Sequence, residues 1–268
     1  MIFAVVSSTN PTKARQIVSI SESFNDDGFS KLEVVWTENS QVFVTYSSHH
    51  RLKQFDDHAL FEAQGTLFPK EKVYPSWREN ITEMQRPLAS NIYTKMAYCQ
   101  CLNGEAGIRL IDAEIDVLEA LSTNPHPNIV EYHGCIREED YMVGICLSKY
   151  RCTLNELIRG QVPPDQRSPF DPDTVISGVM SGLTFLHGLG LVHDDINPHN
   201  IMLNDEGHAV IIDFDSCTHV GAESRGGTPG WSTNPTIAQV ENDEYGLDLI
   251  VQFIRGEYNG ENVEPFGL

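Results

Sequence analysis

Residues 191–216 read LVHDDINPHNIMLNDEGHAVIIDFDS, and this stretch decides the fold that the sequence predicts. Two short apolar runs, residues 201–203 and 209–212, flank the turn sequence Asn-Asp-Glu-Gly. Such a pattern predicts an antiparallel β-hairpin. Because one strand of a hairpin begins beside the end of the other, Asn200 and Asp213 are expected to be neighbours in space.

The polar residues at this end of the hairpin suit a hard divalent cation. Mg²⁺ prefers oxygen ligands, and Asn200 with Asp213 supplies an amide oxygen and a carboxylate. Asp195 lies in the loop that enters the same site. A carboxylate beside bound metal and phosphate would accept or orient a hydroxyl proton. The alternative is an ordinary hairpin with solvated acids at its ends.

Several motifs of this region resemble those of protein kinases. HDDINPHN at residues 193–200 resembles the catalytic loop of the protein-kinase-like fold, and Asp-Phe-Asp at 213–215 resembles its metal-binding motif. With IIDFDSC at 211–217 and GTPGW at 227–231, they are similar to the motifs of a fungal protein-kinase-like family. The resemblance covers residues 90–257 and implies an α+β, bilobal fold with a β-rich N-lobe and a truncated helical C-lobe.

A lysine and a glutamate upstream fit the same resemblance. Residues 92–101, IYTKMAYCQC, predict a strand with Lys95 at its centre. Residues 111–121 carry apolar side chains at helical spacing, with Glu114 beside the apolar face. Glu114 follows Lys95 by 19 positions, a spacing typical of the kinase ion pair that holds the lysine at the α- and β-phosphates of ATP. A solvated strand lysine and an exposed helix acid are the alternatives.

Two further segments follow the order of elements in a kinase. HPNIVEYHGC at residues 126–135 resembles the segment between the glutamate-bearing helix and the fourth strand. YMVGICLSKY at residues 141–150 reads as the fifth strand entering the hinge. The resemblance implies that the hinge offers backbone groups to adenine at Leu147, Ser148, Lys149 and Tyr150.

The second half of the chain supplies helices around the catalytic loop. Asp171 followed by Pro172 predicts a helix start. The apolar stripe of this helix is predicted at Ile176, Val179, Leu183 and Leu186, and the helix is expected to end near Gly188. By resemblance, His193 packs within the catalytic loop and does not act as the base. Asp243 begins a second apolar-patterned helix and, by resemblance, anchors the backbone of that loop.

The sequence also departs from the protein-kinase pattern. No GxGxxG phosphate-covering loop precedes Lys95, and no Ala-Pro-Glu follows the GTPGW motif. Asp194 replaces the usual arginine, so a phosphorylated activation loop cannot dock there, and Asn197 replaces a lysine near the transferred phosphate. Asp215 gives the Asp-x-Asp of small-molecule phosphotransferases in the same superfamily. Residues 216–227 are polar and glycine-rich and predict a flexible loop. The alternative, by resemblance, is a short activation segment with phosphorylation sites at Ser224 and Thr228.

Composition limits the partners. The formal net charge is −20, and a sequence pI near 4.7 argues against nucleic acid or an anionic membrane as the main partner. The sequence contains no run of 18 or more apolar residues, so no membrane span is predicted. The N-terminal sequence does not resemble a secretory signal. The six cysteines lack zinc-type spacing, which indicates reduced thiols. Reduced thiols, with no predicted membrane span or secretory signal, predict a cytoplasmic location.

These observations predict three regions. Residues 1–60 form a β extension packed on the N-lobe, residues 61–150 the N-lobe and residues 151–268 the truncated C-lobe. The expected function is ATP- and Mg²⁺-dependent phosphoryl transfer to an unidentified protein or small-molecule hydroxyl. The open alternative is a pseudokinase that serves as a nucleotide-binding or interaction module.

Overall fold

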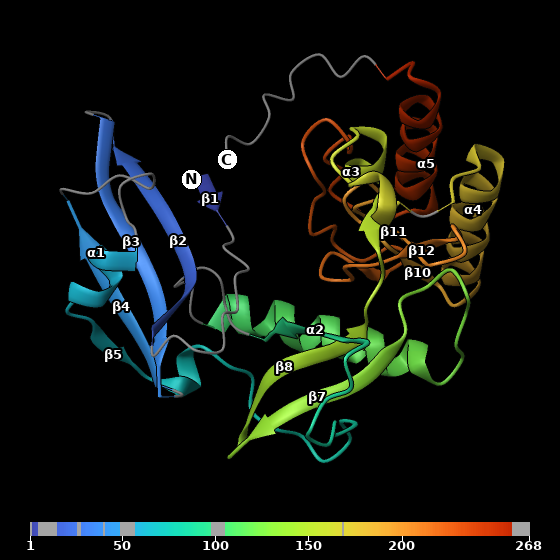
Figure 1. Ribbon diagram of the computed structural model, residues 1–268. Coiled ribbons are helices and arrows are strands. Elements are labelled where there is room, and N and C mark those ends of the chain that lie inside the picture. The colour runs from blue at the N-terminus through green and yellow to red at the C-terminus, as the bar shows by residue number, and fades with distance from the viewer. Residues whose placement is uncertain are drawn as a thin grey trace. The chain divides into compact units, whose positions relative to one another are not determined.

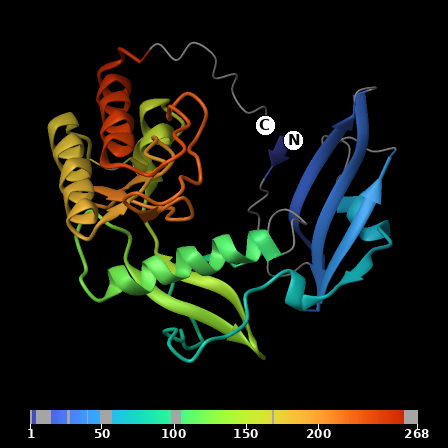
Figure 2. The same ribbon diagram turned by 180° about the vertical axis from the view of Figure 1, so that it is seen from behind.

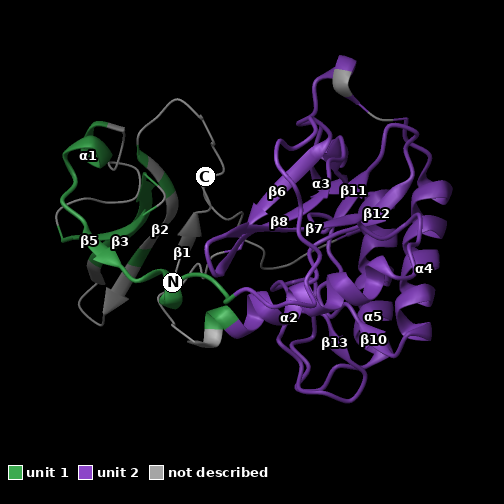
Figure 3. Ribbon diagram, turned by 90° about the horizontal axis from the view of Figure 1, so that it is seen from below, with its two compact units in different colours: residues 1–76, 98–108, 268 green, residues 77–97, 109–267 purple. Residues whose placement is uncertain are grey.

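The computed structural model describes the parts of the chain that form two compact units (Figure 3). One unit comprises residues 1–76, 98–108 and 268, and the other comprises residues 77–97 and 109–267. The boundaries predicted at residues 60 and 150, and the packing of the first region on the N-lobe, stay predictions. The described residues are 2–4, 15–25, 28–39, 41–48, 57–97, 105–167 and 169–258.

The first unit contains an antiparallel five-stranded sheet in the order β1-β2-β3-β4-β5 (Figure 1). Strands β3 and β4 pair antiparallel, with Leu32 opposite Ser47 and Glu38 opposite Gln41. The strands are β1 (Ile2–Ala4), β2 (Arg15–Asn25), β3 (Gly28–Glu38), β4 (Gln41–Ser47) and β5 (Thr66–Phe68).

Arg15 joins this sheet to the short helix α1 (Asp57–Glu62). Its guanidinium lies over the Trp36 ring, 4.4 Å from the centroid, and pairs with Glu38. It also donates to three backbone carbonyls at the end of α1, where a cation is favoured by the helix dipole. Trp36 itself is buried in a small core with leucine, isoleucine and valine side chains.

The second unit begins with a three-stranded sheet in the order β6-β8-β7. Among the described residues, β6 (Ile92–Met96) therefore lies at an edge, next to β8 (Tyr141–Ser148), with β7 (Tyr132–Glu138) beyond. Helix α2 (Glu105–Ser122) runs alongside these strands (Figure 2). The helix predicted over residues 111–121 is confirmed, because Ile115, Leu118 and Leu121 on one face are buried.

The predicted hairpin is also confirmed. β11 (Ile201–Leu203) pairs antiparallel with β12 (Ala209–Ile211), with Ile201 opposite Ile211 and Leu203 opposite Ala209. Every residue of β12 is buried, as the apolar runs required. The short strands β9 (Cys152–Thr153), β10 (Leu191–Val192) and β13 (Thr218–His219) complete the sheets of this unit.

Helices surround the hairpin. Thr153 caps α3 (Leu154–Ile158) through a capping box, and Asp171 caps α4 (Pro172–Gly188) as the sequence predicted. The last helix is α5 (Val240–Arg255), which ends at Gly256 in the left-handed conformation. No helix in the described ranges is long and apolar enough to cross a membrane.

The described cysteines are free thiols inside the second unit. Burial raises the pKa of both Cys135 and Cys217 to about 12, so these thiols stay protonated and unreactive at neutral pH. Cys146 and Cys152 are also buried. Cys99 and Cys101 lie outside the described residues. The expectation of reduced thiols stays a prediction.

Candidate active site

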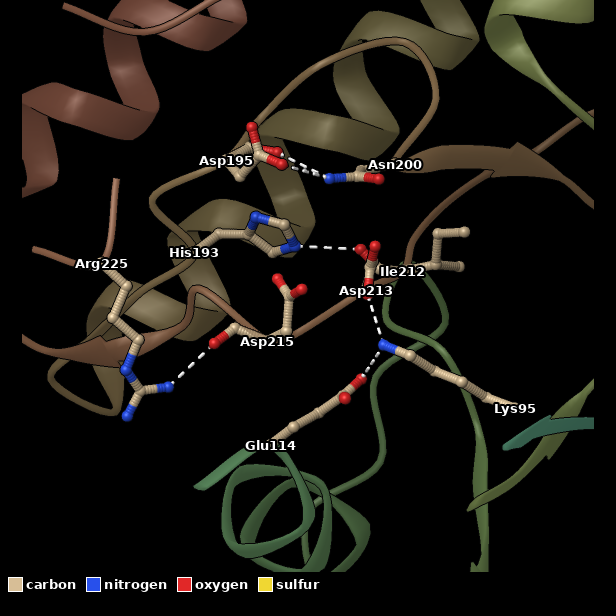
Figure 4. Close-up of polar contacts among 9 residues, drawn as sticks. All are labelled: Lys95, Glu114, His193, Asp195, Asn200, Ile212, Asp213, Asp215 and Arg225. Atoms are coloured by element: carbon tan, nitrogen blue, oxygen red, sulfur yellow. Dashed lines mark hydrogen bonds and ion pairs between the residues drawn. The ribbon is translucent and has the colours of Figure 1, made fainter. Parts of the chain in front are cut away.

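Lys95 joins the β6 strand to two other elements of the second unit (Figure 4). Its Nζ donates to Glu114 Oε1 of α2 at 2.7 Å and to Asp213 Oδ1, just after β12, at 2.6 Å. Glu114 is 2% exposed. The structure therefore brings together three residues that the sequence analysis placed in one site, although Asp213 is 118 positions from Lys95.

The charged side chains of this cluster shift one another's pKa values. Burial opposes protonation of Lys95, but the carboxylates of Glu114 and Asp213 outweigh it and raise the pKa of the ammonium. Burial likewise opposes ionisation of Asp213, but Lys95 outweighs it and lowers the pKa of this carboxyl. Glu114 is enclosed so deeply that burial raises its pKa despite its contact with Lys95. Lys95 therefore stays charged at neutral pH and favours an ionised Asp213.

Asp195 and Asn200 lie in contact in the catalytic loop. Asn200 Nδ2 donates to Asp195 Oδ2 at 2.9 Å and to the Asp195 carbonyl at 3.0 Å, which leaves the amide oxygen of Asn200 as an acceptor. The other carboxylate oxygen, Asp195 Oδ1, accepts the backbone N–H of Thr228 at 2.7 Å. Thr228 Oγ1 also donates to Asp195 Oδ2 at 3.2 Å.

Asp243 of α5 binds the backbone of the catalytic loop. This carboxylate is fully buried and accepts the N–H groups of His193 at 2.9 Å and Asp194 at 2.8 Å. Asp194 has a φ of 67°, in the left-handed region that costs most side chains about 1 kcal/mol. His187 of α4 also donates to Asp243, at 2.8 Å. The predicted anchoring role of Asp243 is confirmed.

His193 links the loop to the hairpin. Its Nε2 donates to the Ile212 carbonyl at 3.0 Å, and its ring meets the edge of Phe214 with centroids 5.0 Å apart. Both side chains are fully buried. His193 is thus a packing residue, as predicted. Its contacts fix Ile212 and Phe214, the two residues that flank Asp213.

Gly246 allows α5 to approach the catalytic loop. A Cβ at this position would lie 2.7 Å from Ile196 Cβ and 2.8 Å from the Ile196 carbonyl oxygen. We expect Gly246→Ala to lower the free energy of unfolding by about 1–3 kcal/mol in urea denaturation, because the loop must shift. Gly188→Ala is the matched helical control, since nothing lies within 4 Å of its added Cβ. A stability of Gly246→Ala equal to that of Gly188→Ala would contradict this expectation.

The donor set around Asp213 fits Mg²⁺ bound together with phosphate. The described residues contain no group of three or more His, Cys, Asp or Glu arranged as a protein-only metal cage. Mg²⁺ instead commonly takes one or two carboxylates and completes its shell with phosphate and water. Asp215 adds a second carboxylate, and this residue is exposed to solvent. Desolvation by the surrounding protein, and then repulsion from Asp213, raise the pKa of the Asp215 carboxyl. A bound cation would reduce the repulsion between the carboxylates of Asp213 and Asp215.

The hinge residues predicted to meet adenine are partly engaged with the protein itself. The N–H of Ser148 donates to the Glu131 carbonyl at 2.9 Å, and the N–H of Lys149 donates to the Asn91 carbonyl at 2.8 Å. The hydroxyl of Tyr150 accepts the N–H of Glu131 at 3.2 Å. Leu147 is buried within β8. Adenine recognition by these four residues stays a prediction.

Sequence reasoning missed two participants at this site. Thr228 was identified only as a motif residue and an alternative phosphorylation site, yet it binds both oxygens of Asp195. Ser224 was identified only as a loop residue and an alternative phosphorylation site, yet its hydroxyl donates to Asp194 Oδ2 at 2.5 Å. The signal that could have found them is the pair of unusual polar residues in the catalytic loop, Asp194 and Asn197, which need partners when buried.

Comparison with known proteins identifies the family of this chain. The protein kinase domain family matches residues 96–248, which is more than half of the chain. The chain belongs to the protein kinase domain family. This family is a class of phosphotransferases, and its fold is the mixed α+β fold that the sequence predicted.

Individual kinases are similar over parts of their length. The serine/threonine-protein kinase Tao of Drosophila melanogaster is 32% identical over 131 residues, covering 45% of this chain and 11% of Tao. The serine/threonine-protein kinase CLA4 of Eremothecium gossypii is 27% identical over 221 residues, covering 76% of this chain and 27% of CLA4. This kinase-family chain thus spans about a quarter or less of the length of these relatives.

A solved structure confirms the fold of the kinase region. A chain in the crystal structure of the yeast RNA Pol II CTD kinase CTDK-1 complex superposes with a TM-score of 0.51. The match covers 62% of this chain and 55% of that chain, at 17% sequence identity. At this identity the likeness concerns the kinase fold alone.

Proposed function

We propose that this protein kinase domain is an ATP- and Mg²⁺-dependent phosphotransferase that transfers the γ-phosphoryl group to a protein or small-molecule hydroxyl. The observation that carries the proposal is the position of Lys95, which binds Glu114 and Asp213 at the same time. A cation held between a buried glutamate of α2 and the end of the hairpin supports a contact with the phosphates of a nucleotide.

Each residue of the site then has a role. Lys95 would contact the α- and β-phosphates, and Glu114 would fix the ammonium in place. Asn200 and Asp213 would hold Mg²⁺, which supplies charge neutralisation to the phosphates. Asp195 would orient the acceptor hydroxyl and accept its proton. Asp195 must exchange its contact with Thr228 for a contact with the acceptor before it can do so.

The motifs also bear on the branch of the family and on the acceptor. We infer membership of a fungal protein-kinase-like group, on the motifs HDDINPHN, IIDFDSC and GTPGW. Asp215 supports a small-molecule acceptor, since with Asp213 it forms the Asp-x-Asp motif of small-molecule phosphotransferases. The similarity to Tao and CLA4, which are named as serine/threonine kinases, supports a protein hydroxyl instead. Both acceptor classes therefore belong in the test.

A pseudokinase is the second candidate, and the hinge favours it. The N–H groups of Ser148 and Lys149 are bound to backbone carbonyls, so they are not available to adenine without rearrangement. The sequence also has no GxGxxG loop, whose backbone would cover the phosphates. In this role the domain would bind a nucleotide weakly, or bind a partner, without transfer.

The test compares wild type with Asp195→Asn, which keeps an acceptor for the Thr228 N–H but cannot accept a proton. We expect wild type to transfer ³²P from γ-labelled ATP to a panel of proteins and hydroxylated small molecules, and to stop when EDTA removes Mg²⁺. Asp195→Asn should lose transfer by about a hundredfold or more while keeping its thermal shift with Mg²⁺-ATP.

The outcomes separate the two candidates. A thermal shift of wild type with Mg²⁺-ATP and no transfer to any acceptor would favour the pseudokinase. Neither shift nor transfer would contradict the phosphotransferase proposal. Transfer that survives in Asp195→Asn would contradict the role given to this carboxylate.

A further inference from the structure

The proposed mechanism assigns no role to residues 77–84, which bind helix α2. Arg78 Nη1 donates to Asp116 Oδ1 at 2.7 Å, and its Nη2 lies 3.5 Å from Asp112 Oδ1. The two aspartates are four positions apart on the helix, where like charges repel each other. Burial raises the pKa of the Asp112 carboxyl, Arg78 opposes this shift and Asp116 adds to it. Arg78 therefore joins the segment to α2 and offsets the repulsion within the helix.

Thr82 makes a second attachment to α2. Its N–H donates to Glu119 Oε1 at 2.6 Å, and its hydroxyl donates to Glu119 Oε2 at 2.9 Å. Tyr132 of β7 adds a third hydrogen bond, from its hydroxyl to Glu119 Oε1 at 2.8 Å. Hydrogen bonds to a charged acceptor are about twice as strong as those between neutral groups. Glu119 therefore joins α2 both to the segment and to the sheet.

Backbone hydrogen bonds join the same segment to β7. The N–H of Cys135 donates to the Thr82 carbonyl at 2.7 Å, and the N–H of Met84 donates to the Cys135 carbonyl at 2.9 Å. The approach is close, since a Cβ on Gly134 would lie 2.5 Å from the Thr82 carbonyl oxygen. Because β7 pairs with β8 and β8 pairs with β6, the segment connects α2 to the sheet that carries Lys95.

The attachments lie on the opposite flank of α2 from Glu114. Successive residues of a helix are about 100° apart, so the three acids that bind the segment lie about 140–160° around the axis from Glu114. On its own flank, Glu114 is buried and binds Lys95 (Figure 4). A rotation of α2 that released the segment would therefore carry Glu114 away from Lys95.

We propose that residues 77–84 form a strap that fixes α2 from within the chain, and that Arg78 and Thr82 are positioning residues for Lys95, acting through Glu114. The strap sets the rotation of the helix, so the contact between Lys95 and Glu114 forms without help from a nucleotide, a partner or a modification. The effect of the strap on phosphoryl transfer rests on the proposed function, whereas its effect on the position of α2 does not.

The first test measures hydrogen exchange without nucleotide in wild type and in Arg78→Gln/Thr82→Val, the strap variant. This double substitution removes the cation and the hydroxyl but keeps the backbone N–H at position 82. Exchange of the Ile115 and Leu118 amides of α2 should become about thirtyfold faster, because an ion pair and a hydrogen bond to a carboxylate are lost. Amides in the middle of α4 should keep their wild-type rates, which separates release of α2 from general unfolding.

The second test follows Lys95 itself by ¹⁵N-edited NMR of its Nζ–H groups. An ammonium held by carboxylates exchanges its protons with water more slowly than a solvated one, so its signal reports the contact with Glu114. Glu114→Gln, which lacks the charge, provides the reference spectrum for a broken ion pair. The Lys95 signal of the strap variant should match that of Glu114→Gln and differ from that of wild type.

Matched variants serve as controls. Arg86→Gln removes a cation just beyond the strap that pairs with Glu138 of β7 at 3.1 Å, and it should leave α2 exchange within about twofold of wild type. Arg78→Lys/Thr82→Ser keeps the charge and the hydroxyl and should stay within about threefold. If the strap variant unfolds, Thr82→Val alone replaces it, with α2 exchange about tenfold faster than in wild type.

Kinetics test the route through Glu114 in a protein that transfers phosphate. The strap variant should lower kcat/KM for ATP by about tenfold or more, because Lys95 loses its position at the phosphates. The same two substitutions in a Glu114→Gln background should cause less than about a twofold further loss. Equal losses in the two backgrounds would overturn the route through Glu114.

The outcomes for the strap and for the proposed function are distinguishable. Wild-type exchange of α2 in the strap variant, or a wild-type Lys95 signal, would overturn the strap. A wild-type protein that shows neither transfer nor a thermal shift with Mg²⁺-ATP would contradict the proposed function, and the exchange and NMR measurements would still decide whether the strap fixes α2.

Discussion

Asp213→Asn is expected to abolish both phosphoryl transfer and the thermal shift with Mg²⁺-ATP. The substitution replaces the carboxylate that we propose as a metal ligand by a neutral amide, and it removes the negative charge that accepts Lys95 Nζ at 2.6 Å. Electrostatic stabilisation by a bound metal is worth several kcal/mol, so transfer should fall by about a thousandfold or more. The measurements are ³²P transfer from γ-labelled ATP and melting temperature with and without Mg²⁺-ATP.

Asp205→Asn is the matched control for this change. Asp205 lies in the turn at the other end of the same hairpin, where it makes a surface ion pair with Arg151 and its side chain is 83% exposed. Transfer by this variant should stay within about twofold of wild type, since exposed ion pairs contribute little. An Asp213→Asn protein with the same nucleotide response as Asp205→Asn would show that the metal lies elsewhere.

Asp243→Asn is expected to cause the largest loss of stability. This fully buried carboxylate accepts the N–H groups of His193 and Asp194, and His187 donates to it as well. An asparagine amide would turn a donor toward at least one of these donors. The free energy of unfolding should fall by about 3 kcal/mol or more in urea denaturation. Exchange of the His193 and Asp194 amides should rise with it.

Asp248→Asn supplies the control on the same helix, because Asp248 is exposed on α5. Its stability should stay within about 0.5 kcal/mol of wild type. If Asp243→Asn were as stable as Asp248→Asn, the catalytic loop would not depend on this carboxylate for its conformation. Unchanged exchange at His193 and Asp194 would lead to the same conclusion.

Local patterns account for the parts of the site that the sequence predicted. The hairpin follows from two apolar runs and a turn, and its register alone places Asn200 near Asp213. The α2 stripe and a 19-residue spacing that resembles the kinase ion pair predict the contact between Lys95 and Glu114. These features depend on periodicity and on order along the chain, and both are properties of the sequence.

The extent of elements was less well determined. Helix α2 begins at Glu105, earlier than the apolar stripe from residue 111 indicated. In α4 the buried face includes Val175, whereas Ile176 of the predicted stripe is only half-buried. This second difference arises because neighbouring residues of a helix lie 100° apart, so packing against other elements selects which one is covered.

The sequence by itself determined the kinase-like hairpin, the lysine–glutamate pair and the identity of the acidic residues that could bind metal. Only the tertiary structure decided how the unusual residues are satisfied: Asp194 by Ser224, Asp195 by Thr228, and the hinge amide of Lys149 by Asn91. These partners are 30 to 58 positions apart and belong to loops without periodicity. Their pairing follows from the need of buried polar groups for hydrogen bonds, and that need is settled only when the chain has packed.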